Sequence, residues 1–202
     1  MENKRKILAD LGELAYAKKG PVKTGIWRGL RAIKYPTDLM LYAELIQQQR
    51  PDLIVECGTR FGGAALFLAD VCEIIGYGHV VTVEISDEFG VLPEHPRLTA
   101  LRGSSTDREI VKTIHYFAGK TAMVILDSDH SAPHVLEELR LYSGLVHVGG
   151  YIIVEDTRQE VPNGPARAIE LFLKENKAFV IDRDVEKYGI HNAAGGFLRR
   201  VK

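Results

Sequence analysis

Short apolar stretches rich in β-branched residues alternate with longer segments of helical periodicity along most of this chain. The stretches are continuous rather than alternating with polar residues, which is typical of parallel strands covered on both faces. The pattern predicts strands at residues 53–57, 79–84, 98–101, 122–126, 151–154, 178–181 and 196–199. It predicts helices at residues 37–49, 64–71, 132–145 and 165–175. This order of elements predicts a doubly wound α/β sheet.

The first predicted helix has polar residues at its start and a proline after its end. Thr37 or Asp38 is expected to cap it, because a short oxygen-bearing side chain accepts hydrogen bonds from free backbone N–H groups. Pro51 is expected to close its exit. No repeat, low-complexity tract or linker divides the 202 residues, so we expect a single domain over residues 1–202.

The composition argues against several classes of protein. Apolar residues make up 46% and charged residues 26%, which is ordinary for a globular protein. The formal net charge is -1 and no basic stripe is visible, so we expect no nucleic-acid partner. No apolar run reaches membrane-spanning length and no signal peptide is recognisable, which favours a cytoplasmic protein that does not bind membranes. Cys57 and Cys72 stand in apolar stretches and are expected to be core residues.

A glycine-rich turn follows the strand at residues 53–57. Gly58, Gly62 and Gly63 let the backbone turn sharply and approach a ligand, while Glu84 ends the next strand, where a carboxylate accepts both hydroxyls of a ribose. The spacing G-x-x-x-G-G differs from the dinucleotide pattern G-x-G-x-x-G, which favours an adenosine ligand without a pyrophosphate. The alternative is that the glycines serve only tight packing between strand and helix.

Carboxylates follow two predicted strands that we expect to be neighbours. Asp127 comes after one strand, and Glu155 and Asp156 come after the next. Gathered at one edge without an evident Lys or Arg partner, the three would repel one another, and a hard divalent cation would relieve that repulsion. Oxygen ligands favour Mg²⁺, with Mn²⁺ or Ca²⁺ as alternatives. The competing interpretation is that Glu155 and Asp156 are solvated loop carboxylates or a helix cap.

Two histidines follow the first of these carboxylates. His130 is three residues past Asp127, and a histidine that titrates near neutral pH can take a proton from a hydroxyl acceptor. His134 lies one helical turn further on and is the second candidate. Either histidine can instead cap or pack the helix that follows.

Several motifs, taken in order, carry a family resemblance. They are Glu56-x-Gly58-Thr59-x-x-Gly62-Gly63, Gly103-Ser104-Ser105, Leu126-Asp127-Ser128-Asp129-His130-Ser131 and Val154-Glu155-Asp156-Thr157, flanked by Lys34-x-Pro36-x-Asp38 and Gly195-Gly196-Phe197-Leu198-Arg199-Arg200. Over roughly residues 27–200 the chain resembles the cephalosporin hydroxylase family, whose members have the class I methyltransferase fold. The resemblance implies a mostly parallel, seven-stranded sheet whose last strand is antiparallel.

The resemblance also implies a ligand for each part of the site. S-adenosylmethionine would lie over the first strand ends, and its binding set would be Glu56, Gly58, Thr59, Gly62, Glu84, Ser104, Ser105 and Asp127. Within this set Glu84 would hold the ribose, and Ser104 and Ser105 would border the adenine. Magnesium would lie on Asp127, Glu155 and Asp156, and His130 would stand at the offset of the catalytic base in catechol-type O-methyltransferases.

The resulting hypothesis is metal-assisted methyl transfer to a hydroxyl of a small molecule. Residues 1–36 are expected to form an N-terminal lid or packing segment, with Trp27, Lys34 and Tyr42 over the acceptor. The loop at residues 158–165 is a second candidate for closing over the site. Two alternatives are a nicotinamide-dependent oxidoreductase and a non-catalytic nucleoside-binding partner of another enzyme. A homo-oligomer is compatible with this sequence.

Overall fold

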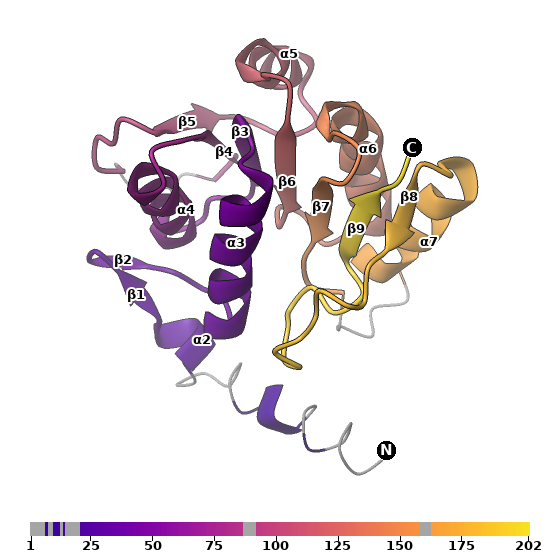
Figure 1. Cartoon of the computed structure of the whole chain (residues 1–202), viewed down its shortest axis with the longest axis horizontal. Helices are drawn as coiled ribbons and strands as arrows, with labels where there is room; N and C mark the ends of the chain where they lie inside the picture. The colour runs from indigo at the N-terminus through magenta and orange to yellow at the C-terminus, as the bar shows by residue number, and fades with distance from the viewer. Residues whose placement is uncertain (1–6, 8–9, 13, 15–20, 87–91, 158–162) are drawn as a thin grey trace.

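The computed structural model describes residues 7, 10–12, 14, 21–86, 92–157 and 163–202. Seven strands of this part form one sheet in the order β5-β4-β3-β6-β7-β9-β8 (Figure 1). Their bounds are β3 Leu53–Cys57, β4 His79–Glu84, β5 Leu98–Arg102, β6 Ala122–Leu126, β7 Tyr151–Val154, β8 Phe179–Ile181 and β9 Phe197–Arg200. Strands β5, β4, β3, β6 and β7 pair in parallel, whereas β9 is antiparallel to both β7 and β8. The predicted doubly wound sheet and its antiparallel last strand are confirmed.

Helices cover both faces of this sheet (Figure 1). On one face lie α3 Pro36–Gln49 and α4 Gly63–Ile74, and on the other lie α5 Arg108–Phe117, α6 Ala132–Tyr142 and α7 Pro165–Glu175. The helix expected to end near residue 145 is α-helical only to Tyr142 and continues as the 3-10 turn Ser143–Leu145. Helix α5 is an element that the sequence pattern did not reveal, and Asp107 caps it by accepting from Glu109 N and Ile110 N.

Two apolar layers hold the helices to the sheet. Every residue of β3 and β6 is buried, and side chains that alternate along these strands point to opposite faces. Val55 and Val124 pack toward α5, α6 and α7, whereas Ile54 and Met123 pack toward α3 and α4. Cys57 and Cys72 are free and buried, as predicted, one in each layer. The rigid sheet fixes where the loops at its carboxyl edge begin.

The start of α3 differs from the prediction that Thr37 or Asp38 caps it. Tyr35 is the capping residue, and no side chain supplies a capping hydrogen bond. Thr37 Oγ1 instead donates to Ile190 O at 2.6 Å, and the fully buried Asp38 contacts His191 Nδ1 at 2.7 Å. The backbone N–H of Asn192 donates to the second oxygen of Asp38. Both polar side chains therefore hold the segment before β9, a long-range contact that local sequence cannot reveal.

A short hairpin precedes α3 and lies against α4. It follows α2 Pro21–Thr24 and consists of β1 Ile26–Trp27 and β2 Leu30–Arg31. Trp27 Nε1 donates to Asp70 Oδ2 at 2.7 Å, and its ring meets Phe67 edge-on with centroids 5.0 Å apart. Trp27 thus anchors the hairpin to α4. Among the residues that the structure describes, no helix combines the length and apolar character needed to cross a membrane.

Candidate functional site

A cavity of about 550 Å³ opens where the loops leave the carboxyl ends of the parallel strands. Such edges are where doubly wound sheets bind ligands. The predicted site residues that line this cavity are Gly58, Thr59, Glu84, Ser104, Ser105, Asp127, His130 and Asp156. Three others, Glu56, Gly62 and Glu155, are not part of its lining. The predicted loop at residues 158–165 lies mostly outside the described residues.

The glycine turn after β3 is shaped by one close backbone approach. Gly58 has φ +96°, and a Cβ built on it would lie 2.1 Å from the carbonyl oxygen of Asp127. Any other residue would therefore both adopt a left-handed backbone and collide with the end of β6. Gly62, at φ +81°, is the capping residue of α4. The turn brings the backbone of β3 against the residue that starts the acidic cluster.

Glu84 is held at the end of β4 by backbone donors. Its Oε2 accepts from Arg60 N at 2.6 Å and its Oε1 accepts from Ser86 N at 2.8 Å. The carboxylate therefore has a fixed orientation on the cavity wall, next to the glycine turn. Each of its oxygens keeps a lone pair for a further donor.

Glu56 lies beneath the turn rather than on the cavity wall. Its side chain is buried and accepts from Thr82 Oγ1 at 2.6 Å, and Thr82 Oγ1 also lies 2.5 Å from Thr59 Oγ1. Burial raises the pKa of Glu56 to about 7, and the charge of Lys34 and the Thr82 hydrogen bond oppose the rise. This carboxyl supports the floor of the site through Thr82 and Thr59.

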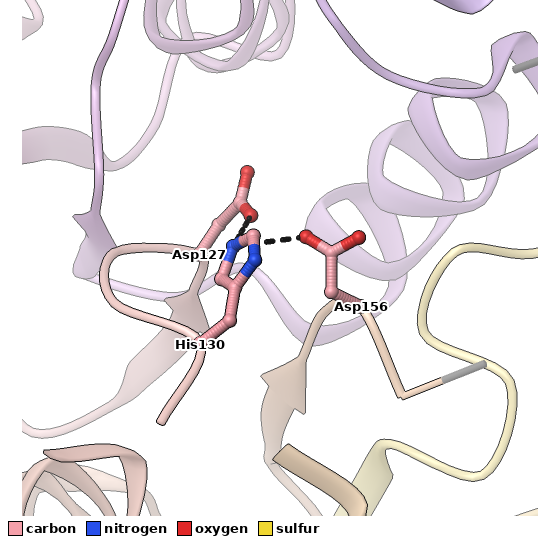
Figure 2. Close-up of side chains that lie close together, drawn as sticks. All are labelled: Asp127, His130 and Asp156. Atoms are coloured by element: carbon pink, nitrogen blue, oxygen red, sulfur yellow. Dashed lines mark ion pairs between the residues drawn. The ribbon is translucent and has the colours of Figure 1, made fainter. Parts of the chain in front are cut away.

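Asp127, His130 and Asp156 form the acidic end of the cavity (Figure 2). One ligand atom of each lies within 4.8 Å of the others. The imidazole lies between the two carboxylates, with Nε2 3.0 Å from Asp156 Oδ2 and 3.6 Å from Asp127 Oδ1. Asp156 adopts a left-handed backbone with φ 55°, which is uncommon outside glycine and tends to mark functional positions.

The pKa values of these three groups shift in different directions. The hydrogen bond with Asp127 raises the pKa of His130 against the effect of burial, and the charge of Asp156 adds to the rise. Burial also raises the pKa of Asp127, but Lys34 and His130 outweigh it and leave that pKa below its ordinary value. Burial and the nearby Asp127 charge raise the pKa of Asp156. Asp127 is thus the carboxylate most firmly held in its charged form.

The expectation that the carboxylates lack a cationic partner is wrong. Lys34, which is buried, bonds to Asp127 Oδ2, and its Nζ lies 2.6 Å from Glu155 Oε1. Tyr42 Oη donates to the same oxygen of Glu155 at 2.8 Å, and Asn192 Nδ2 donates to Oε2 at 3.2 Å. Burial raises the pKa of Glu155 to about 8 despite the opposing charge of Lys34. The burial of Lys34 and Tyr42 contradicts a lid role for these two side chains.

His134 belongs to a different part of the cavity wall. Its Nε2 lies 3.1 Å from Ser105 Oγ and 3.5 Å from Glu138 Oε1. The hydrogen bond with Glu138 raises the pKa of His134 against burial. The structure therefore separates the two candidate histidines, because only His130 joins the acidic cluster.

Sequence reasoning missed two residues that the structure brings to the site. Asn192 lines the cavity, and Glu138 lies behind it. A usable signal existed for Glu138, because it stands on the predicted apolar face of its helix, beside Leu139 and four residues after His134. Asn192 lies in an irregular segment and gave no such signal.

One known protein family matches almost the whole chain. Residues 20–201 match the family described as Rhamnosyl O-methyltransferase/CmcI. The chain belongs to this family. The Rhamnosyl O-methyltransferase of Mycobacterium leprae (strain TN) is 34% identical over 193 residues, which cover 88% of this chain and 83% of that relative. The resemblance inferred from the motifs is thereby confirmed.

Solved structures of family members share the fold. A CmcI-N160 apo-structure superposes with a TM-score of 0.74 and 22% identity, covering 89% of this chain and 77% of the other. A structure of CmcI-D160 with Mg and SAM superposes with a TM-score of 0.71 at the same 22% identity, covering 89% and 78%. At 22% identity, this similarity shows a shared fold and nothing more specific.

Proposed function

We propose that this protein transfers a methyl group from S-adenosylmethionine to a hydroxyl of a small molecule, assisted by a divalent cation. The observation that carries the proposal is one cavity that joins the turn at Gly58 and Glu84 to the acidic cluster of Asp127, His130 and Asp156. Membership of a family named for O-methyl transfer supports the reaction class. It also favours this reaction over the nicotinamide-dependent and non-catalytic alternatives.

The nucleoside and methionine parts of the donor would bind along the first strand ends. Glu84 would accept the ribose hydroxyls with the lone pairs left free by its backbone donors. The turn at Gly58 and Thr59 would contact the methionine part, with Glu56 below it and Gly62 opening the N-terminus of α4. Ser104 and Ser105 would border the adenine.

The acidic cluster has a donor set that fits a divalent cation. Asp127 and Asp156 would hold it. Glu155, the third ligand expected from the sequence, does not line the cavity and is instead bonded to Lys34, Tyr42 and Asn192. A cation bound there would lower the pKa of the acceptor hydroxyl and fix its orientation. Carboxylate oxygens suit Mg²⁺, Mn²⁺ and Ca²⁺.

His130 would take the acceptor proton. Its ring faces the cavity and is half-buried, whereas the ring of His134 is directed to Ser105 and Glu138. Lys34 would keep the side chains of Asp127 and Glu155 in place from below. The buried floor excludes water beneath the reacting groups, which strengthens each of these interactions.

We further propose a sugar hydroxyl of the rhamnose type as the acceptor. The support is the name of the related rhamnosyl enzymes, and polar side chains such as Arg31 and Asn192 on the cavity wall suit a polyol. Within the expected N-terminal segment, residues 31–34 would supply part of the acceptor wall, since Arg31 and Ile33 line the cavity.

Two measurements test this function. Calorimetry should detect S-adenosylhomocysteine but not NADH, and the reverse preference would refute the assignment of the nucleoside end. Transfer of labelled methyl from S-adenosylmethionine to a methyl rhamnoside should require added Mg²⁺ or Mn²⁺. Undiminished turnover in excess EDTA would refute the proposed role of the cation.

A further inference from the structure

A buried glutamate lies behind the cavity wall and connects two loops. These loops follow strands that are not neighbours in the sheet. Glu138 on α6 is 0% exposed, and its Oε1 accepts from Ser105 Oγ at 2.5 Å and from Ser128 Oγ at 2.6 Å. The loops that carry these serines follow β5 and β6, and both β4 and β3 lie between those strands. Both serines line the cavity. Glu138 therefore fixes two separate parts of the wall from one point.

Core packing does not explain a carboxylate at this position. The neighbouring buried positions of α6 are apolar and include Val135, Leu139 and Tyr142. A buried charge costs free energy unless it is fully paired, and Oε2 of Glu138 has no hydrogen-bond partner among the described residues. A leucine would satisfy the helix without that cost. The glutamate is thus better explained by what it does to the two serines.

A carboxylate fixes the direction of the hydrogen bonds that it makes. An ionised carboxylate only accepts, and a serine hydroxyl has a single hydrogen to donate. Ser105 and Ser128 therefore both turn their hydrogens toward Glu138. Their remaining capacity is the oxygen lone pairs, one of which on Ser105 faces His134 Nε2 at 3.1 Å. This part of the wall consequently offers acceptors to a ligand.

We propose that Glu138 is a positioning residue that makes this wall select a base bearing an exocyclic amino group, as adenine does. The inference rests on the proposed function for the class of ligand, a nucleoside. An amino group donates to the oriented serine oxygens. Hypoxanthine has a carbonyl oxygen at the same position, which would face a serine oxygen without a hydrogen between the two acceptors. Glu138 acts through Ser105 and Ser128 and does not touch the ligand itself.

The test compares two ligands that differ in the base. Calorimetry would measure S-adenosyl-L-homocysteine and S-inosyl-L-homocysteine against the wild-type protein, Glu138→Gln and Glu137→Gln. Glu137 is the matched control, because it is on the same helix, its side chain is 50% exposed and it contacts Arg140 at 3.8 Å. The wild type and the control should prefer the adenine ligand by about tenfold or more, as sites built for one hydrogen-bond pattern do.

Glu138→Gln should lower this preference to about threefold or less. The carboxamide N–H donates to the oxygen of one serine, and the O–H of that serine is then free to turn toward the ligand. A purely structural role would weaken both ligands equally and leave their ratio unchanged. If Glu138→Gln does not fold, Ser128→Ala removes one oriented acceptor and should reduce the ratio as well.

A wild type that binds the two ligands equally would overturn the inference. So would an undiminished preference in Glu138→Gln or, where that variant does not fold, in Ser128→Ala. A wild type that binds neither ligand would instead refute the proposed function, and this inference with it.

Discussion

Lys34 Nζ lies 2.6 Å from Glu155 Oε1, and the two side chains are 3% and 1% exposed. Burial disfavours the charge on Lys34, but Asp127, Glu155 and Glu56 outweigh it and hold the pKa of the ammonium well above its ordinary value. Without this ammonium, the buried carboxylates would face one another with little positive charge nearby to offset their repulsion. Lys34 is therefore the internal counterion of the acidic end of the cavity.

We expect Lys34→Met to destabilise the metal-free protein by about 3–5 kcal/mol, because removing one partner leaves buried charges uncompensated. Lys187→Met is the matched control: its ammonium binds Glu44 but its side chain is 51% exposed. An exposed pair of this kind contributes little to stability, because solvent and salt screen it. Urea unfolding measures both. Added Mn²⁺ should restore part of the loss in Lys34→Met, and a loss no larger than in the control would contradict the counterion role.

Gly58→Ala should destabilise the protein and abolish binding of S-adenosylhomocysteine. The added Cβ would lie 2.1 Å from a backbone oxygen of Asp127, which cannot move without disturbing the end of β6. Gly76→Ala is the control, because Gly76 also has a positive φ, +68°, but its Cβ would meet nothing within 4 Å. The control should cost only the strain of the left-handed backbone, about 1–2 kcal/mol. Equal effects in thermal unfolding and calorimetry would contradict this account of the turn.

His130→Ala should lower the rate of methyl transfer by about 10²–10⁴-fold, the usual contribution of a general base. Binding of S-adenosylhomocysteine should change little, because His130 lies at the acidic end of the cavity. His115→Ala, at an exposed position on α5, should leave both quantities unchanged. Steady-state kinetics and calorimetry decide the question. Loss of donor affinity in His130→Ala without a loss of rate would count against the assignment.

The pKa of Glu56 predicts a pH dependence of stability in the absence of ligands. Burial raises this pKa from 4.5 to about 7, so between these values the folded state keeps a proton that the unfolded state releases. The free energy of unfolding should therefore fall as pH rises through that window, by on the order of 3 kcal/mol from this group alone.

Glu56→Gln should reduce the fall in stability between pH 4.5 and 7, measured by urea unfolding, and leave the part that comes from the raised pKa of Glu155. Glu109→Gln, whose side chain is 75% exposed, should leave the curve unchanged. A wild-type stability that rises across this window, with the same slope in both variants, would show that the carboxyl is not held in its neutral form.

The sequence pattern was sufficient for the sheet because its strands are continuous apolar runs separated by glycine turns. All seven strands of the sheet were predicted with ends within one residue of those observed, as at β3 Leu53–Cys57. Helix α5 was missed, although it has a strongly one-sided apolar face and Asp107 as its cap. The hairpin β1–β2 was missed because each strand has only two residues.

The candidate site was predictable only in the parts that lie directly after a strand. Glu84 ends a strand, and Asp127 and Asp156 come shortly after one, so the fold alone places them at the cavity. Lys34 was assigned to a lid because its position in sequence, before α3, says nothing about its burial beneath Asp127. That contact joins residues that are 93 positions apart, and only the packed structure reveals it.

The antiparallel course of β9 has a consequence for how acceptor preference can diversify. Strand β8 ends and β9 begins at the carboxyl edge, so residues 182–196 leave the sheet and return to it beside the cavity. Asp38 anchors this excursion near Asn192, which lines the cavity. Exchanges at Asn192 would reshape the cavity wall while every strand keeps its register. Evolution, or a designer, can therefore retune what is methylated by replacing one surface loop and leaving the donor site untouched.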